Sequence, residues 1–401
     1  MNNYDIIIVG GGASGFFTAN ILLDKNPSLQ VLMLEKTDKL LQKVKISGGG
    51  RCNVTHYEFN PTTFSKNYPR GQKLLKKNLR TFGAEEMIEW LSSKGVDTKT
   101  EEDGRMFPES NSSQTIIDCL LSVLELEHFT LKKKSPIIDF QVLGDRIQVI
   151  GQKEEWTTKK LVLSTGSSKS IWKLLAQKKI RITPPVPSLF TFTLRDHPLK
   201  GLEGISITNA SIKVASTKLQ ESGPLLITHK GISGPAVLKL SAFGAKELAA
   251  MHYHFTVIIN FTGLEKEEEV RSVISELEKS KKLLANESIF GLSKRLWHRI
   301  LERSDISASK VGIDLSKKEK NKLINELYQG HYIVEGKNTF KEEFVTAGGI
   351  DLTEIDRSTY EFKKLPGVYA VGELLDIDGV TGGFNFQGCW TSGWIVGNTS
   401  L

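Results

Sequence analysis

The feature that most constrains this chain is a GxGxxG pattern at residues 10–15, which stands between two apolar segments. Residues 6–9 read IIIV, a β-branched run typical of a strand buried on both faces of a parallel sheet. Residues 13–23 carry a helical apolar stripe, and a second apolar run follows at 31–34. The order of strand, glycines, helix and strand over about 30 residues predicts a βαβ unit.

Each glycine of this pattern has a physical role in binding a dinucleotide. Gly10 permits the tight turn, Gly12 lets the backbone approach a pyrophosphate, and Gly15 lets the helix pack close to the strand. The helix N-terminus adds free N–H groups and the positive end of its dipole. Glu35 is placed to accept hydrogen bonds from an adenosine ribose, and its charge disfavours a 2′-phosphate. A glycine-rich turn without a ligand is the alternative, and it explains less of this context. The neighbouring residues that we assign to the same dinucleotide site are Ala13, Ser14 and Lys36.

Composition excludes several other classes of protein. The formal net charge of +7 is mild for 401 residues and, as we read it, spread along the chain without a compact basic tract. The three cysteines form no CxxC pair, which argues against a disulfide framework, a zinc site or a dithiol redox pair. No apolar stretch approaches the length of a membrane helix, and the first apolar run passes directly into the glycine turn. We therefore expect a cytoplasmic protein without a membrane segment or a metal site.

The pattern of apolar and polar residues changes twice along the chain. Residues 1–187 and 338–401 have the style of an α/β nucleotide-binding domain. Residues 188–262 and 331–337 alternate apolar and polar side chains, which predicts a half-exposed antiparallel sheet or a small barrel. Residues 263–330 are charged and show helical periodicity. We predict an α/β fold in which a Rossmann-type domain is interrupted by a β-barrel-like insert that carries a small helical subdomain.

A second glycine cluster lies in the segment KVKISGGGRCNVTH at residues 43–56. Three consecutive glycines leave the backbone open to a flat ring or a phosphate. Arg51 adds a bidentate donor for phosphate or carboxylate, although a structural arginine in a glycine loop is the alternative. Cys52 is either a redox-active thiol beside Arg51 or, as we favour, a packing residue.

Two histidine-containing segments offer polar groups. In LITHKGISGPAVLKL, at 226–240, His229 lies between a strand and a helix that begins at Pro235, and we name His229 and Arg51 as candidate catalytic residues. The alternative for His229 is a hydrogen-bonded residue in a capped turn. His252 and His254 alternate onto one face of a predicted strand at 251–261, and we read them as a solvated face because no third metal ligand is near.

The C-terminal stretch YAVGELLDIDGVTGGFNFQGCWTSGWIVG, at 369–397, suits a flavin. A β-run ends at Gly372 and Glu373, and Gly382 and Gly383 introduce a helix. Glu373 can accept hydrogen bonds from ribityl hydroxyls. The helix N-terminus can face the pyrimidine end of the ring, where negative charge gathers on reduction, and so tune the flavin potential.

Several motifs, in order over nearly the whole chain, resemble the bacterial FAD flavoproteins that include aminoacetone oxidase and the bile-acid-inducible flavoreductases. They are IIIVGGGASG, ISGGGRCNVTH, DGRMFPESNSSQTIID, LLITHKGISGPAVLKLS, FVTAGGIDLTEI and LPGVYAVGELLDIDGVTGGFNFQGCWTSGWIVG. The resemblance implies FAD as cofactor, bound in a Rossmann-type domain, with the ADP half at Gly10, Gly12, Gly15 and Glu35. The residues that it places near the flavin are Lys43, Gly48, Gly49, Gly50, Arg51, Gly372, Glu373, Gly383, Phe384, Asn385 and Phe386. We also assign Gly166 to cofactor binding.

The chain departs from this family pattern at two places. Leu41 stands where the family usually has a glycine before the basic pair, and the family's long glycine- and tyrosine-rich loop is shortened to residues 164–177. If that loop shapes the substrate pocket, no relative's substrate transfers to this chain.

Three functions remain open from the sequence. The first is an FAD-dependent oxidoreductase that moves a hydride between a small organic substrate and NAD(P)H or O₂, with any NAD(P)H bound transiently because no second GxGxxG is present. The second is a flavin-dependent tRNA-modifying protein, although we expect no nucleic-acid partner because arginines do not cluster with interleaved aromatics. The third is a non-enzymatic FAD-binding sensor.

Overall fold

The computed structural model describes residues 2–287, 289–338 and 345–400. The chain divides into two compact units, residues 1–186 with 341–401, and residues 187–340. No helix in the described ranges is both long and apolar enough to span a membrane.

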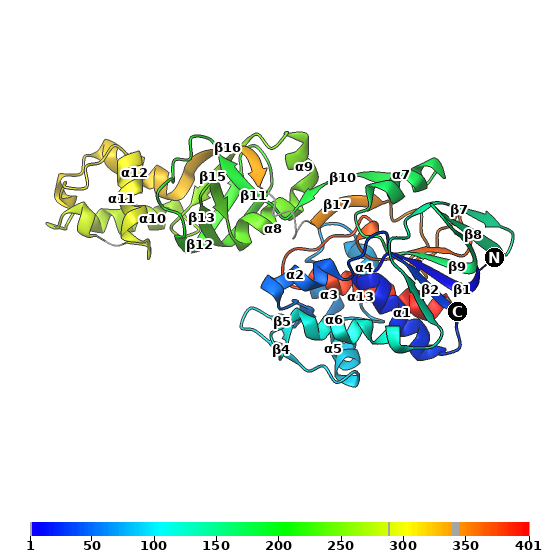
Figure 1. Ribbon diagram of the computed structural model, residues 1–401. Helices are drawn as coiled ribbons and strands as arrows, with labels where there is room; N and C mark the ends of the chain where they lie inside the picture. The colour runs from blue at the N-terminus through cyan, green and yellow to red at the C-terminus, as the bar shows by residue number, and fades with distance from the viewer. Residues whose placement is uncertain (1, 288, 339–344, 401) are drawn as a thin grey trace. The chain divides into compact units, whose positions relative to one another are not determined.

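The first unit is built on a seven-stranded sheet with β1 at its centre (Figure 1). Ile6 pairs with Val31 of the next strand, and Val9 pairs with Leu34 on one side and Leu163 on the other, all in parallel register. The prediction of a doubly buried strand is confirmed. The parallel strands are β1 (Asn2–Val9), β2 (Val31–Leu34), β6 (Phe129–Lys132), β9 (Glu155–Leu163) and β18 (Val368–Ala370), and an antiparallel hairpin of β7 (Ile137–Leu143) and β8 (Arg146–Gly151) extends the sheet beside β9.

Two helices pack closely behind the glycine turn, α1 (Ala13–Lys25) and α13 (Phe384–Thr399). Small residues permit this approach, because a Cβ at Gly397 would lie 2.7 Å from Cγ2 of Ile21. The remaining helices of the unit are α2 (Gln42–Gly50), α3 (Pro61–Ser65), α4 (Gln72–Asn78), α5 (Ala84–Ser93), α6 (Ser113–Leu121), η1 (Ser122–Glu125), α7 (Lys169–Gln177) and η4 (Gly372–Leu374). Two small sheets complete it, one of β3 (Thr55–His56), β4 (Thr98–Thr100) and β5 (Arg105–Pro108), and one of β10 (Ile182–Ser188) and β17 (Val345–Ile350).

The second unit contains a closed antiparallel barrel, so the prediction of a β-barrel-like insert is confirmed. Its strands, in barrel order, are β11 (Thr191–Leu194), β14 (Gly231–Ser233), β13 (Gln220–Thr228), β12 (Ser206–Val214), β15 (Phe255–Asn260) and β16 (Gly330–Asn338). The predicted helical segment forms α10 (Glu267–Leu277), η2 (Leu284–Asn286), α11 (Lys294–Arg303), η3 (Gly312–Asp314) and α12 (Lys317–Gln329). Two further helices, α8 (Pro235–Phe243) and α9 (Ala245–Ala250), lie between β14 and β15.

The predicted strand at 251–261 is wrong over its first four residues. Helix α9 ends at Ala250, and the chain then turns through His252 (φ +52°) and Tyr253 (φ +60°) in the left-handed region before β15 begins at Phe255. His252 and His254 therefore share no strand face, and the His254 ring is instead hydrogen-bonded to the carbonyl of His252 at 2.8 Å. Within the described residues, no group of three or more potential metal ligands is found.

Candidate cofactor site

The glycine turn after β1 has the geometry that the sequence pattern predicts. Gly10 has φ +115°, and a Cβ there would lie 2.6 Å from the carbonyl oxygen of Ser164. A Cβ at Gly15 would lie 2.2 Å from the carbonyl oxygen of Gly10. By contrast, no described heavy atom lies within 4 Å of a Cβ built on Gly12, the N-cap of α1. Two glycines thus permit close packing, and the third leaves open space in front of the helix N-terminus.

Glu35 is oriented by hydrogen bonds at the end of β2. Its Oε2 accepts from the backbone N–H of Gly11 at 2.8 Å, and its Oε1 accepts from the backbone N–H of Thr37 at 2.8 Å. A carboxylate has about four lone-pair sites, so capacity remains for ribose hydroxyls. The side chain is therefore fixed beside the glycine turn in a position where it can still accept further hydrogen bonds.

A cavity of about 460 Å³ lies at the carboxyl ends of the parallel strands, within the first unit. Open α/β sheets bind ligands in this place, and the volume is in the usual range of small-molecule sites. The cavity runs past the glycine turn and Glu35, and side chains from η4 and α13 also line it. The predicted residues that line it are Gly10, Gly12, Ala13, Ser14, Glu35, Lys36, Lys43, Gly166, Glu373 and Phe386.

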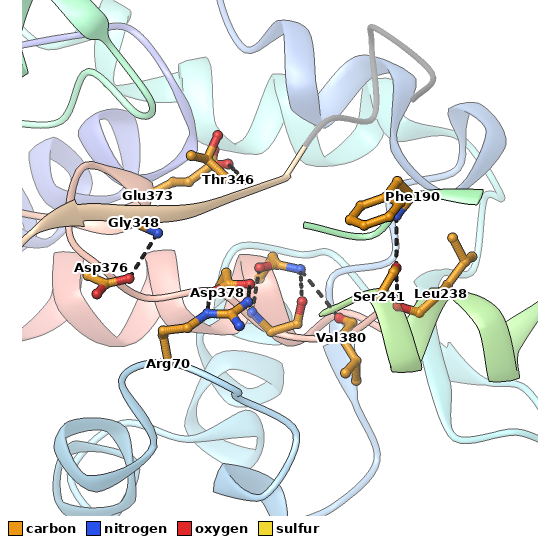
Figure 2. Close-up of polar contacts among 12 residues, drawn as sticks. Arg70, Phe190, Leu238, Ser241, Thr346, Gly348, Glu373, Asp376, Asp378 and Val380 are labelled. Atoms are coloured by element: carbon orange, nitrogen blue, oxygen red, sulfur yellow. Dashed lines mark hydrogen bonds and ion pairs between the residues drawn. The ribbon is translucent and has the colours of Figure 1, made fainter. Parts of the chain in front are cut away.

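At one end of the cavity, Glu373 of η4 is held from two sides. Its Oε1 accepts from the backbone N–H of Thr346 at 3.1 Å, and its Oε2 forms an ion pair with Lys43 of α2 (Figure 2 shows Glu373 beside Thr346). Gly372, with φ +66°, donates its N–H to Oγ of Ser392 at 3.0 Å. Motifs that are far apart in the sequence thus meet at this end.

The N-terminus of α13 is built by tight packing. Gly383 has φ +92°, and a Cβ there would lie 2.4 Å from the carbonyl oxygen of Thr55. The Asn385 side chain accepts from the N–H of Gly379 at 2.8 Å and donates to its carbonyl at 2.9 Å. Phe384 stacks on the His56 ring with centroids 4.8 Å apart. Gly383, Phe384 and Asn385 shape the turn and are not among the residues that line the cavity.

The second glycine cluster ends α2 in three left-handed residues. Gly48, Gly49 and Gly50 have φ of +57°, +68° and +85°. A Cβ on Gly48 would lie 2.9 Å from the Phe107 ring, whereas those on Gly49 and Gly50 would meet no described atom within 4 Å. The cluster is therefore an open turn that only glycine adopts easily.

Arg51 and Cys52 follow this turn. The Arg51 guanidinium pairs with Glu101 at 2.5 Å and lies over the Phe107 ring, 3.9 Å from its centroid. Cys52 is fully buried, and burial raises the pKa of its thiol to about 12. Such a thiol is inert at neutral pH, which supports the packing role.

His229 is exposed in the turn between β13 and β14 of the second unit. The predicted helix that starts at Pro235 is confirmed as α8, with β14 between the histidine and that helix. His229 is not among the residues that line the cavity, and its catalytic role stays a prediction.

Several residues that line the cavity carry no motif that predicts them from the sequence. Thr165 follows β9, and its Oγ1 is buried without a hydrogen-bond partner among the described residues. A buried hydroxyl of this kind is available to a ligand. Leu41, the family departure, keeps the left-handed conformation (φ +51°) that glycine adopts easily. Several of the others follow the end of a parallel strand, and that position could have indicated them. The further lining residues include Thr37, Ser135, Pro136, Ile137, Ser167, Ser168 and Cys389.

The residues present fit a dinucleotide cofactor. The open Gly12 position meets the N-terminus of α1, Glu35 is fixed for ribose hydroxyls, and the cavity continues to the Glu373 end. These are the features by which a Rossmann-type domain binds a dinucleotide such as FAD.

Known proteins match this chain over nearly its whole length, both in sequence and in fold. The chain is 27% identical to a ribosomal RNA dihydrouridine synthase of Escherichia coli, over 98% of this chain and 97% of that protein. It is also 27% identical to a 3-dehydro-bile acid delta(4,6)-reductase of Clostridium scindens, over 98% of each. Among solved structures, a 3-ketosteroid-delta4-(5alpha)-dehydrogenase of Rhodococcus jostii matches the fold with a TM-score of 0.52 at 12% identity, over 99% of this chain and 97% of that chain.

A flavocytochrome c3 fumarate reductase shares the fold at a TM-score of 0.52 and 16% identity, over the whole of this chain and 78% of that one. Both solved structures share the fold of this chain at low sequence identity. The family model described as HI0933-like protein Rossmann domain matches residues 4–399, so the chain belongs to this family of FAD-binding Rossmann proteins.

Proposed function

We propose that this chain is an FAD-dependent reductase that adds hydrogen across a carbon–carbon double bond conjugated to a carbonyl. The observation that supports the proposal is the single continuous cavity from the glycine turn to Glu373, which suits an extended dinucleotide. The names of two relatives suggest which type of reduction this chain would catalyse. Dihydrouridine is uridine with its ring double bond reduced, and a delta(4,6)-reductase removes ring double bonds of a steroid. Both names describe the same class of reaction on different substrates.

In this proposal the residues of the chain bind and orient, and FAD, when bound, supplies hydride transfer. The N–H groups at the start of α1 hold the pyrophosphate over Gly12, and Glu35 accepts from the adenosine ribose. Glu373, steadied by Lys43, accepts from the ribityl chain. The first turn of α13, from which Phe386 lines the cavity, would stabilise negative charge on the reduced flavin through its positive dipole end.

The electron donor is NAD(P)H, bound transiently. Overall, one NAD(P)H and one proton are consumed, and the substrate gains two hydrogens as NAD(P)⁺ leaves. The thiol of Cys52 takes no part, because it is fully buried and burial raises its pKa to about 12.

The experiment is an absorbance spectrum of the purified protein, followed under anaerobic conditions as NADH or NADPH is added. We expect flavin bands that bleach, and that return when a conjugated enone is added, with a product that has gained two hydrogens by mass spectrometry. Bands that return only with air would favour an oxidase. A protein that shows no flavin bands after reconstitution with FAD would overturn the proposal.

A further inference from the structure

Strand β17 contains the residues TAGGI, at 346–350, and lies beside the segment that carries Glu373. The backbone N–H of Thr346 donates to Oε1 of Glu373 at 3.1 Å (Figure 2). Two residues further along β17, the N–H of Gly348 donates to Oδ1 of Asp376 at 2.9 Å, which Figure 2 also shows. The strand therefore uses its backbone donors to hold two carboxylates, and the first of them lines the cavity.

The hydroxyl of Thr346 is buried without a hydrogen bond. The residue is 3% exposed, and its Oγ1 has no partner among the residues that the structure describes. An unpaired buried hydroxyl costs free energy, and valine, which has nearly the same shape, would avoid that cost. Thr346 is not among the residues that line the cavity, whereas Glu373 is. An effect of this hydroxyl on the cofactor should therefore pass through Glu373.

At the ribose end of the same cavity, a threonine holds a glutamate with two donors. Oε1 of Glu35 accepts from the N–H of Thr37 at 2.8 Å and from its hydroxyl at 2.9 Å. The hydroxyl of a threonine can thus reach the acceptor of its own N–H. At the other end of the cavity, Glu373 is held by the N–H of Thr346 alone. We call the N–H and the hydroxyl of one threonine, acting on one carboxylate, a two-donor clamp.

The cation that pairs with Glu373 does little to fix its orientation. The Lys43 side chain is 52% exposed, and an ion pair with an exposed lysine contributes little, because the long side chain must be ordered and water screens the charge. A hydrogen bond from a buried hydroxyl to a carboxylate is stronger, because the acceptor is charged. A second donor from Thr346 would therefore hold Glu373 more firmly than Lys43 does.

We propose that Thr346 is a positioning residue for FAD. When the cofactor is bound, the Thr346 hydroxyl donates to Glu373 and completes a two-donor clamp like that of Thr37 on Glu35. The carboxylate keeps its remaining lone pairs for hydroxyls of the ribityl chain. The inference rests on the FAD site of the proposed function, and it explains why a threonine stands where a valine would pack equally well.

The test compares two substitutions of Thr346 with a matched control. Thr346→Val removes the hydroxyl and keeps the shape of the side chain, whereas Thr346→Ser keeps the hydroxyl. The control, Thr158→Val, removes a hydroxyl of β9 that belongs to a fully buried residue and donates to the carbonyl of Asp5 at 2.9 Å. Fluorescence titration measures the affinity for FAD, calorimetry that for ADP, and urea unfolding the stability of each apoprotein.

We expect Thr346→Val to raise the dissociation constant of FAD about three- to tenfold, the effect of one lost hydrogen bond. Its urea midpoint should equal or exceed that of the parent chain, because valine removes an unpaired hydroxyl. Thr346→Ser should keep FAD affinity within about twofold of the parent chain. Thr158→Val should show the opposite pattern, a lower urea midpoint with FAD affinity within about twofold. ADP, which lacks the flavin half, should bind to Thr346→Val and to the parent chain equally well.

A double-mutant cycle tests whether Thr346 acts through Glu373. Residues that work as one unit have non-additive effects, so in a Glu373→Ala background Thr346→Val should change FAD affinity by less than about twofold. A purely structural role of Thr346 would lower the urea midpoint and would not depend on the Glu373 carboxylate.

Three results would overturn the inference: FAD affinity in Thr346→Val equal to that of the parent chain, a urea midpoint that falls as in Thr158→Val, or an equal loss of affinity with and without the Glu373 carboxylate. Reduction of a free enone by NAD(P)H, measured on the same preparations, separates the two proposals. A parent chain that binds FAD with these differences but reduces no enone keeps the positioning role and removes the proposed reaction. A parent chain that reduces the enone, with unchanged FAD affinity in Thr346→Val, does the reverse.

Discussion

Lys43 of α2 and Glu373 of η4 form an ion pair although 330 residues separate them in the sequence. The Glu373 side chain is 15% exposed, whereas that of Lys43 is 52% exposed. The second oxygen of Glu373 accepts from the N–H of Thr346. The carboxylate is thus held in one orientation at the end of the cavity by a flexible cation and a backbone donor. This ion pair joins the two motifs that the family resemblance places near the flavin.

Glu373→Ala is expected to weaken FAD binding while the chain stays folded. Hydrogen bonds to a charged group contribute about 1.5–3 kcal/mol, so the dissociation constant of FAD should rise about ten- to a hundredfold. Fluorescence titration of the apoprotein with FAD measures it. Glu247→Ala, at an exposed glutamate of α9, is the control. Unchanged affinity in Glu373→Ala would remove this residue from the cofactor site.

Two alanine substitutions in the glycine turn should have different effects, one on stability and the other on FAD affinity. A Cβ at Gly15 would lie 2.2 Å from a backbone carbonyl oxygen, so Gly15→Ala forces the strand and helix apart and destabilises the fold by several kcal/mol. Gly12→Ala meets open space at an extended backbone and should leave stability within about 0.5 kcal/mol. It should nevertheless lose FAD affinity, because its methyl group occupies the place of the pyrophosphate.

Urea unfolding of the apoproteins and FAD titration separate these two effects. Equal stability of the two variants would contradict the packing role of Gly15. Full FAD affinity in Gly12→Ala would contradict the position that we give to the pyrophosphate.

The first βαβ unit could be predicted from the sequence, because its strand, glycine turn and helix follow one another directly in the chain. The sequence was also sufficient for the barrel-like insert, where period-two alternation is strong. The prediction was wrong at His252 and His254 because alternation alone does not reveal that α9 continues to Ala250 and ends in a left-handed turn. The alternation of apolar and polar residues at 251–254 is the same as that of a strand, so sequence alone does not distinguish the turn from a strand.

The cavity lining was harder to predict than the fold. Thr165 and Ser135 carry no motif, and they reach the site only because their strands end at the same edge of the sheet. Leu41 stands where the family usually has a glycine, and it adopts a left-handed φ of +51°, a conformation that glycine adopts easily.

Asp378→Ala is expected to destabilise the first unit strongly. The Asp378 side chain is fully buried and that of Arg70 is 11% exposed, so the substitution removes a carboxylate that is ion-paired with a nearly buried guanidinium. Removal of one member of a buried ion pair costs about 3–5 kcal/mol. The free energy of unfolding in urea measures the change. Asp305→Ala, which removes the exposed partner of Lys322, is the control and should cost less than about 1 kcal/mol. A loss of similar size in both variants would contradict the buried role of Asp378.

Stability should fall steeply at alkaline pH. Burial raises the pKa of the Cys52 thiol to about 12 and that of the Cys119 thiol to about 11, from an ordinary value of 9.0, and it also raises the pKa of Tyr68. Above about pH 9 the unfolded chain releases thiol protons that the folded chain retains, so the free energy of unfolding drops by about 1.4 kcal/mol per pH unit for each such thiol. Below about pH 9 both states hold these protons, and the groups contribute no pH dependence.

Urea unfolding near pH 8 and near pH 10.5 measures this loss. Because Cys119 lies within α6, where alanine is well tolerated, Cys119→Ala is the informative variant. Its loss between the two pH values should be smaller than that of the parent chain by about 1–2 kcal/mol. The thiols should also resist iodoacetamide in the folded protein near pH 8 and react only in urea, because the thiolate is the nucleophile. Rapid labelling of Cys52 or Cys119 in the folded protein, or equal alkaline losses in both chains, would contradict the burial that raises their pKa values.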